Sequence, residues 1–258
     1  MTDDERSSAR YLYAVCRGLD PAVLQGVPGL GDAPLEVVVQ QDLAAVVSTV
    51  SLAVFGEEAL RRNLEDIAWL EETARVHDQV VRAVSRCAPT APMRLATICF
   101  DDAVVRARLR EWYVDLAHVL DRIEGCSEWS VKVLTAPTEP AIDDPAAPAV
   151  TNGADYLRRK KLLAERRSAH DSSVAEAAGR IHDALVLLAR ASRVLPAQDP
   201  RLSGHRGTMV LNAAYLVPDQ ERAAFAALVE QLCTHDDRVV VYSRGPWPPY
   251  SFAMLEAR

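Results

Sequence analysis

The chain has few aromatic residues and none of the sequence motifs that mark the common enzyme classes. Aromatic side chains make up 6% of its 258 residues, so alanine, valine and leucine must form most of the core. It lacks the G-x-S-x-G pattern of serine hydrolases, a glycine-rich phosphate loop and the G-x-G-x-x-G dinucleotide fingerprint. The sequence therefore gives no support to hydrolytic or nucleotide-dependent catalysis.

Metal-binding and disulfide patterns are also missing. The five cysteines are an odd number, are widely separated and form no C-x-x-C pair, and the six histidines show no H-E-x-x-H spacing. Clustered ligands at short spacings are typical of zinc sites, and an even set of cysteines is typical of disulfide-stabilised domains. We therefore expect free thiols in a reducing compartment, no metal and no other cofactor.

The charge balance and hydropathy argue against two classes of partner. The net charge of −7 argues against general affinity for nucleic acid or for anionic lipid, both of which need a basic surface. No apolar stretch approaches the roughly 18 residues that a membrane helix needs, and the acidic N-terminus lacks the pattern of a signal peptide. We expect a cytoplasmic protein that binds neither nucleic acid nor a lipid membrane.

Strands and helices alternate in the first half of the chain. Runs rich in β-branched residues predict strands, and apolar residues at spacings of three and four predict helices. The predicted strands are 11–16, 35–40, 43–50, 93–100 and 128–134, with the second and third forming a hairpin around Gln41-Asp42. The predicted helices are 57–86 and 102–124.

A proline-rich stretch, residues 136–153, is the best candidate for a domain boundary. It carries four prolines and no periodic pattern, which is typical of a linker or a mobile loop. We therefore predict an N-terminal α+β domain at 10–135 and a C-terminal domain at 154–258. The second domain is expected to contain a long helix at 154–191 and then strand 208–217, a helix from Pro218 and strand 238–244.

The predicted fold class is α+β, with helices packed on mainly antiparallel sheets. In the C-terminal domain, a strand, a helix and a strand follow one another closely, which is half of a ferredoxin-like sandwich. We expect at least this domain to be a modified ferredoxin-like sandwich.

The C-terminal tail is a rigid segment that carries three aromatic residues. After Tyr242-Ser243-Arg244 the chain reads Gly245-Pro246-Trp247-Pro248-Pro249-Tyr250-Ser251-Phe252. Proline fixes φ and removes a backbone donor, so this segment is predicted to end the strand before it. The tail either fills the core of its own domain or binds a partner; in the second case Trp247, Tyr250 and Phe252, with Tyr242, make the contact.

The first half of the 154–191 helix is basic where the second half is apolar. Arg158 and Lys160 lie in the basic part, whereas Val174, Ile181 and Leu185 form a regular apolar stripe in the second half. A helix that is polar all round is a solvated surface, a bridge between domains or a binding site for a partner. Arg158 and Lys160 are therefore further candidates for partner binding.

Several strings in the sequence resemble the gas vesicle L/F family (GvpL/GvpF), and they occur in the family's order. They are Tyr11-Leu12-Tyr13-Ala14-Val15, His77-Asp78-Gln79-Val80-Val81, Ala91-Pro92-Met93-Arg94-Leu95-Ala96-Thr97, Glu128-Trp129-Ser130-Val131-Lys132-Val133, Gly153-Ala154-Asp155-Tyr156-Leu157-Arg158-Arg159-Lys160, Leu211-Asn212-Ala213-Ala214-Tyr215-Leu216-Val217 and the tail. Each string alone is weak evidence. Their combination covers nearly the whole chain, from Tyr11 to Phe252.

The resemblance implies an accessory protein of gas vesicle formation with a two-domain α+β fold that is partly ferredoxin-like. It further implies association with the small hydrophobic shell protein (GvpA-like) and with other gas vesicle accessory proteins, and a location at the gas vesicle in the cytoplasm. It implies no enzymatic activity and no cofactor. The family functions are not transferred to the proline-rich insert or to the basic segment, because the sequence departs from the family pattern there.

Two alternatives from other classes remain open. A ferredoxin-like small-molecule enzyme, or a binding module unrelated to vesicles, would bring polar side chains such as Arg94 and Asn212 together at one pocket. A nucleic-acid binder would use the basic segment around Arg158 and would show salt-sensitive affinity.

Overall fold

The computed structural model of the chain describes residues 7–136, 153–198, 207–233 and 236–253. The chain divides into two compact units: unit 1 comprises residues 1–128 and 246–258, and unit 2 comprises residues 129–245. The sequence-based division instead placed the whole segment 154–258 in the second domain. The difference arises because the tail packs on residues of unit 1. The predicted linker lies, apart from its two end residues, outside the described residues.

Unit 1 is built on an antiparallel sheet. Its strands are β1 (Ser8–Arg17), β2 (Leu35–Gln40), β3 (Leu43–Ser51), β4 (Thr90–Pro92) and β5 (Ile98–Cys99). The order is β2-β3-β1-β4, and β5 also pairs with β1. The predicted hairpin is confirmed, because β2 and β3 pair from Gln40 and Leu43 outward across a two-residue turn.

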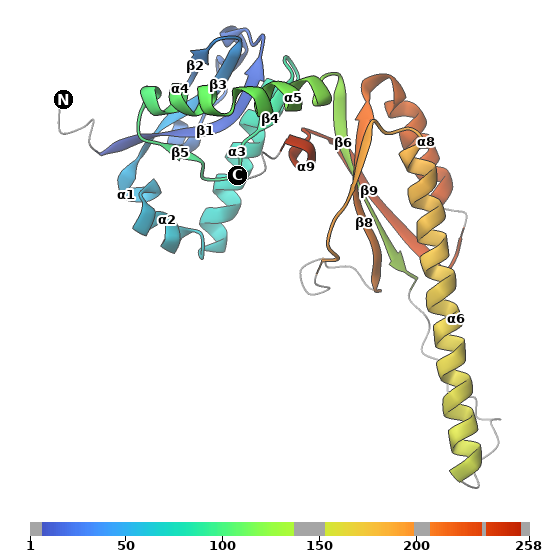
Figure 1. Ribbon diagram of the computed structural model, residues 1–258. Coiled ribbons are helices and arrows are strands. Elements are labelled where there is room, and N and C mark those ends of the chain that lie inside the picture. Colours follow the sequence, from blue (N-terminus) through green and yellow to red (C-terminus); the bar gives the residue numbers. More distant parts are fainter. Residues whose placement is uncertain (1–6, 137–152, 199–206, 234–235, 254–258) are drawn as a thin grey trace. The chain divides into compact units, whose positions relative to one another are not determined.

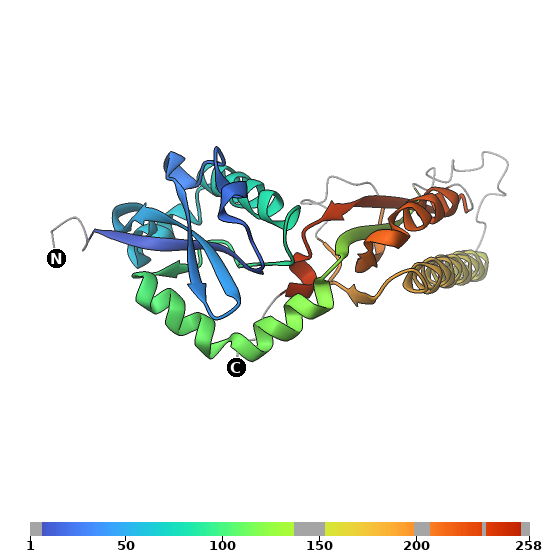
Figure 2. The same ribbon diagram turned by 90° about the horizontal axis from the view of Figure 1, so that it is seen from above.

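Helices cover both faces of this sheet, as Figures 1 and 2 show. One side carries α3 (Ile67–Ser85), preceded by α1 (Leu52–Phe55) and α2 (Glu57–Asn63). The other carries α4 (Asp102–Glu111) and α5 (Tyr113–Ile123). Two 3-10 turns, η1 (Pro21–Leu24) and η2 (Leu30–Asp32), lie in the loop between β1 and β2. The unit is therefore a sheet between two helical layers.

A β-bulge in β1 decides which side chains meet α3. The register with β3 shifts between Leu12 and Ala14, so Tyr13 is the extra residue. A bulge interrupts the alternation of side chains between the two faces. As a result, Tyr11, Tyr13 and Cys16 all join the core cluster that contains the α3 residues Val80 and Val84.

Three elements of unit 1 differ from the prediction. The single helix expected at 102–124 is interrupted at Trp112, which separates α4 from α5. The single helix expected at 57–86 is broken, because the side chain of Asp66 accepts hydrogen bonds from the backbone N–H groups of Ala68 and Trp69 and so starts a new helix. Of the strand expected at 93–100, only β5 is extended, and Ala96 before it has a φ of 61°. A positive φ cannot continue a strand.

Unit 2 has a four-stranded sheet with helices on one face. Its elements are β6 (Cys126–Thr135), α6 (Gly153–Val186), β7 (Ala191–Val194), β8 (Met209–Pro218), η3 (Asp219–Glu221), α8 (Arg222–Cys233) and β9 (Val239–Trp247). The strand order is β7-β8-β6-β9. Thr135 N donates to Thr208 O and Ala136 N donates to Arg238 O. The end of β6 thus lies beside the starts of β8 and β9, so these pairs are antiparallel.

The core of unit 2 lies between this sheet and the helices α6 and α8. The predicted apolar stripe on the second half of the long helix is confirmed, because Val174, Ile181 and Leu185 are buried there. Phe225 of α8 is fully buried and its ring contacts those of Trp129 and Tyr215. The fold is therefore α+β with antiparallel sheets, as predicted.

The strand at the end of unit 2 is longer than expected. We predicted that Gly245 and Pro246 would stop it, but β9 runs to Trp247. Because β9 is the terminal strand of its sheet, a proline is tolerated there. A short helix, α9 (Tyr250–Ala253), follows in unit 1. No helix among the described residues is both long and apolar enough to span a membrane.

Candidate interaction surfaces

Four of the strings that carry the family resemblance meet in one buried cluster of unit 1. The hydroxyl of Tyr11 lies 3.0 Å from Nδ1 of His77 and accepts a hydrogen bond from the backbone N–H of Ala96 at 3.0 Å. The ring of Tyr250 lies against His77, with 6.5 Å between the ring centroids. This cluster therefore joins β1, α3, the turn before β5 and the tail.

The environment of His77 keeps its imidazole neutral. Burial lowers the pKa of His77 to about 4, against the weaker opposing influence of the Met93 backbone and of Asp78. A neutral imidazole can accept a hydrogen bond at Nδ1 from the Tyr11 hydroxyl. His77 was predicted to be a hydrogen-bonded core histidine, and this is confirmed.

Tyr13 plays a parallel role for the loop before β2. Its hydroxyl accepts a hydrogen bond from the backbone N–H of Leu30 at 2.8 Å and lies 2.8 Å from Oγ of Ser48. The loop is tight, since Gly31 and Asp32 both have positive φ angles. The two tyrosines thus each fix one irregular loop from inside the core.

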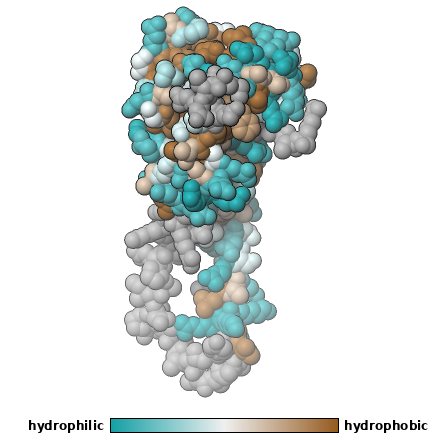
Figure 3. All heavy atoms as spheres, turned by 90° about the vertical axis from the view of Figure 1, so that its left-hand side faces the viewer, coloured by the Kyte–Doolittle hydropathy of each residue, from teal (hydrophilic) through white to brown (hydrophobic). Residues whose placement is uncertain are grey.

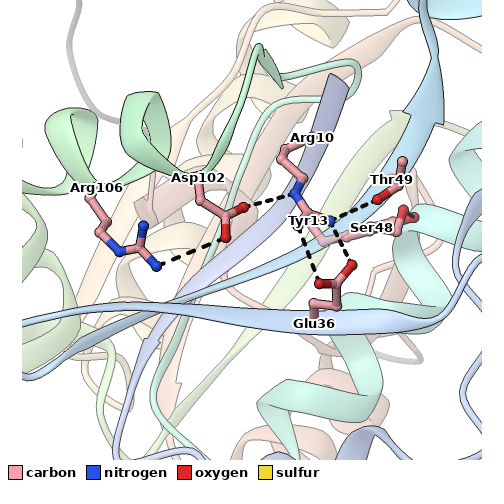
Figure 4. A network of polar contacts seen from close by, with 7 residues as sticks. All are labelled: Arg10, Tyr13, Glu36, Ser48, Thr49, Asp102 and Arg106. Carbon is pink, nitrogen blue, oxygen red and sulfur yellow. Dashed lines mark hydrogen bonds and ion pairs between the residues drawn. The ribbon is translucent and has the colours of Figure 1, made fainter. Parts of the chain in front are cut away.

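On the other face of the sheet, Arg10 is held by acidic side chains from two elements (Figure 4). Its guanidinium donates to Glu36 of β2 at 2.5 Å and to Asp102 of α4 at 2.8 Å, and also to Oγ1 of Thr49. Burial would lower the pKa of Arg10, but the hydrogen bonds and charge of Glu36 and Asp102 raise it. The guanidinium N–H groups of Arg10 are used in these contacts. The network therefore connects β1 with its neighbours and leaves no free site for an anion.

The tail is held in unit 1 by polar and aromatic contacts. The Tyr250 hydroxyl donates to Asp78 at 3.3 Å, and the backbone N–H and hydroxyl of Ser251 donate to the Glu128 carboxylate at 2.7 and 2.6 Å. The guanidinium of Arg82 lies over the ring of Trp247, 4.2 Å from its centroid. Burial and the nearby charge of Asp78 raise the pKa of Tyr250.

The predicted partner-binding residues therefore fall into two groups. Phe252 is only 6% exposed, and its carbonyl accepts a hydrogen bond from Arg122; Trp247 and Tyr250 are partly buried. Phe252 is therefore shielded by unit 1, whereas Trp247 and Tyr250 keep part of their surface accessible. Tyr242, in contrast, is 38% exposed on β9.

Arg158 and Lys160 lie on a part of α6 that packs on nothing in the described chain. All described side chains from 157 to 169 are exposed, and neither Arg158 nor Lys160 forms an ion pair with a described residue. Figure 1 shows this half of α6 extending past the strands of unit 2, and Figure 3 shows it mainly hydrophilic with isolated apolar side chains. The apolar ones are Leu157, Leu162 and Leu163.

The two residues that the enzyme alternative would bring to one pocket belong to different units. Arg94 is exposed in unit 1. Asn212 belongs to unit 2, where its Nδ2 donates to the carbonyl of Pro196 at 2.7 Å. In the described part of the chain, no group of three histidine, cysteine or acidic side chains is arranged to hold a metal ion.

Sequence reasoning missed the pairing of Glu128 with Ser251, which are far apart in the chain. Glu128 stood in a predicted strand and Ser251 in the tail, and neither position carried a signal of its own. The structure shows that a largely buried carboxylate anchors the tail, because a buried charge requires hydrogen-bond donors.

Comparison with known proteins gives a consistent result. The family model described as "Gas vesicle synthesis protein GvpL/GvpF" matches residues 9–254. Gas vesicle protein L of Streptomyces sp. (strain CB03234) is 41% identical over 248 residues, which cover 95% of this chain and 92% of that protein. Gas vesicle protein F of the same organism is 26% identical over 255 residues, 94% of this chain and 98% of the relative.

Solved structures share the fold. The crystal structure of GvpF from Anabaena sp. PCC7120 superposes with a TM-score of 0.66 at 19% identity and covers 97% of this chain and 98% of that one. GvpF from Microcystis aeruginosa gives a TM-score of 0.65 at 18% identity, covering 96% and 99%.

Proposed function

Since a family model covers residues 9–254, the chain belongs to the gas vesicle GvpL/GvpF family, and we propose that it binds the small hydrophobic shell protein during vesicle assembly. A gas vesicle wall must be apolar on its inner face, so its subunit exposes aggregation-prone surface before assembly. An acidic accessory protein can shield such a subunit or guide its ordered addition. Other gas vesicle accessory proteins are the second class of partner in this proposal.

The proposed contact surface is the free edge of the sheet in unit 2. The observation that carries it is the position of β9 at the end of that sheet, with the aromatic ring of Tyr242 exposed. A terminal strand can accept a further strand by main-chain hydrogen bonds, and an exposed aromatic ring adds apolar contact area. The proposed role of Trp247, Tyr250 and Phe252 is to anchor the chain at the end of β9 and just after it.

The basic half of α6 is the second part of the proposal. Arg158 and Lys160 present positive charge without an ion-pair partner among the described residues. Such charges speed association with an acidic partner and restrict its orientation. We assign this surface to other accessory proteins, because a shell subunit that is mainly apolar offers little to a cationic helix.

Co-purification with the shell protein tests the first contact. We expect Tyr242→Ala to reduce the amount of shell protein recovered with the purified chain several-fold, since one large apolar contact is commonly worth about 1–2 kcal/mol at an interface. Tyr242→Phe keeps the ring and should retain binding. If Tyr242→Ala, folded by circular dichroism, recovers as much shell protein as the wild type, the β9 edge is not the contact.

Charge reversal tests the second contact. The double variant Arg158→Glu, Lys160→Glu should lose accessory proteins at low salt while shell-protein recovery is retained. Lys161→Glu is the matched control on the same helix, because Lys161 already lies 3.9 Å from Glu165. If the double variant and the control lose accessory proteins to the same extent, binding depends on net charge alone. Arg158 and Lys160 would then not be a specific binding site.

A further inference from the structure

The connection between α2 and α3 forms an exposed acidic surface on unit 1. Residues 63–74 contain four acidic residues and no basic one, and the side chains of residues 64–68, 71 and 72 are exposed. Figure 1 shows this connection away from the strands of the unit. We refer to residues 63–74 as the acidic corner.

Two of the four carboxylates in the acidic corner have partners, and two do not. The side chain of Asp66 accepts hydrogen bonds from the backbone at the start of α3, and Glu72 pairs with Arg75 at 2.5 Å. Glu65 and Glu71, in contrast, form no ion pair with a described residue. Like charges held close together on a surface repel one another, so an added group of positive charge is favourable there.

Apolar side chains are exposed between these carboxylates. Ile67 is 73% exposed and Leu64 is 44% exposed. Ile67 and Glu71 are four residues apart in α3, so they lie on the same face of the helix. Exposed apolar groups that are bordered by charged residues are typical of sites of protein–protein contact.

The basic half of α6 is the complement of the acidic corner. Residues 157–169 contain six basic residues and one acidic residue, and neither Arg158 nor Lys160 forms an ion pair with a described residue. The exposed apolar side chains among them are Leu157, Leu162 and Leu163. Both surfaces therefore combine apolar side chains with charges that are mainly of one sign, and the two signs are opposite.

From this complementarity we propose that the chain binds a second copy of itself, with the basic half of α6 of one copy on the acidic corner of the other. The cations of the first copy then neutralise Glu65 and Glu71 of the second, and the exposed leucines of α6 cover Ile67. Exposed ion pairs alone contribute little, so the apolar contact supplies the other part of the binding. The two surfaces differ, so the contact is heterologous.

The local charges must outweigh the repulsion between two acidic molecules. Each copy carries a net charge of −7, so two copies repel at long range. At 0.1 M salt, however, the Debye length is about 10 Å. Repulsion between the distant charges is then largely screened, whereas charges in direct contact still attract.

This inference goes beyond the proposed function, although it concerns the α6 surface that is assigned there to other accessory proteins. A second copy and an accessory protein would compete for this surface. Self-association is therefore measured on the purified chain alone. Its failure would leave the proposed contact with accessory proteins untouched, and the reverse also holds.

Sedimentation equilibrium of the purified full chain tests the proposal. We expect concentration-dependent association at 0.1 M NaCl that weakens about tenfold or more at 0.5 M NaCl, because salt screens exposed charges. The α6 variant Arg158→Glu, Lys160→Glu and the corner variant Glu65→Lys, Glu71→Lys should each associate at least about tenfold more weakly than the wild type, since like charges then meet.

A mixture of the two variants is the sharpest test. The α6 variant keeps its acidic corner and the corner variant keeps its basic helix, so opposite charges meet again and association should return. The matched control is Glu57→Lys, Glu111→Lys, which changes the net charge as the corner variant does. Its carboxylates lie outside the corner and already pair with Arg61 and Arg108, so it should associate as the wild type does.

Several results would overturn the proposal. A wild type that stays monomeric up to its highest soluble concentration, association that does not respond to salt, or equal association of the corner variant and its control would each do so. So would a mixture of the two variants that remains monomeric. The concentration and salt dependence of the wild type decides the matter even if a variant does not fold.

Discussion

The hydroxyl oxygen of Tyr11 lies 3.0 Å from Nδ1 of His77, inside the core of unit 1. This contact joins the first strand of the chain to the long helix α3. Because the same hydroxyl accepts the N–H of Ala96, it also fixes a turn whose backbone has a positive φ. One phenol thus holds three segments that are distant in sequence.

We predict that Tyr11→Phe destabilises unit 1 by about 1–3 kcal/mol, because the variant leaves a buried imidazole nitrogen and a backbone N–H without their partner. Chemical denaturation followed by circular dichroism measures the change. Tyr242→Phe removes the same hydroxyl from an exposed ring and should change the free energy of unfolding by less than about 0.5 kcal/mol. Equal effects of the two variants would show that the Tyr11 hydroxyl is not important for stability.

We expect His77 to make the folded state less stable in acid. Its pKa is about 4 in the folded chain against 6.5 for an exposed imidazole. Above pH 6.5 both states are neutral at this residue, whereas between pH 6.5 and pH 4 only the unfolded chain takes up the proton. Stability should therefore fall as the pH falls through this window, by up to about 1.4 kcal/mol per pH unit.

His77→Gln isolates this contribution. Carboxylates also titrate in the same range, but their effect is common to both proteins and cancels in the difference. The free energy of unfolding, measured from pH 7 to pH 4, should depend less steeply on pH in the variant. Parallel pH profiles for the two proteins would contradict a neutral, buried His77.

The tail should contribute to the stability of unit 1. Phe252 is buried there, and truncation of a buried phenylalanine typically costs about 3–5 kcal/mol. We therefore predict that Phe252→Ala lowers the unfolding transition of unit 1, monitored by hydrogen exchange of α3 and β1. Tyr242→Ala removes a partly exposed ring and is the control. If it lowers the unfolding transition of unit 1 as much as Phe252→Ala does, the buried Phe252 ring does not anchor the tail to unit 1.

Gly29 cannot carry a side chain without movement of its neighbours. A Cβ atom there would lie 2.9 Å from the Tyr13 hydroxyl oxygen and 2.9 Å from the Ala33 carbonyl oxygen. We predict that Gly29→Ala destabilises the protein by about 1–3 kcal/mol, as overpacking does. Gly179 lies in α6 with open space around its Cβ position, so Gly179→Ala should instead stabilise by up to about 1 kcal/mol. Thermal denaturation of both variants checks the opposite signs.

Much of the fold could be predicted from local patterns. The hairpin at 35–51, the apolar stripe of α6 and the long strands β1, β6, β8 and β9 each carry a periodic or β-branched signal in their own residues. The break between α2 and α3 was missed because Leu64 and Ile67 continue the apolar spacing although both are exposed. The side-chain hydrogen bonds of Asp66 outweigh that pattern.

The placement of the tail could not be predicted from its sequence. Its prolines and aromatic rings were compatible with either a core segment or a partner-binding segment. The choice depends on Asp78, Arg82, Arg122 and Glu128, which lie more than a hundred positions earlier in the chain. No local pattern links these residues to the tail.

The sequence by itself determined the family, the α+β class and the identity of most elements, because these depend on local periodicity and on strings of adjacent residues. Only the tertiary structure decided that Tyr11, His77, Ala96 and Tyr250 share one cluster, that the tail belongs to unit 1, and that β2 and β9 are terminal strands. These features depend on which distant segments pair and on which backbone groups remain unpaired. Neither property is encoded in any single stretch of the chain.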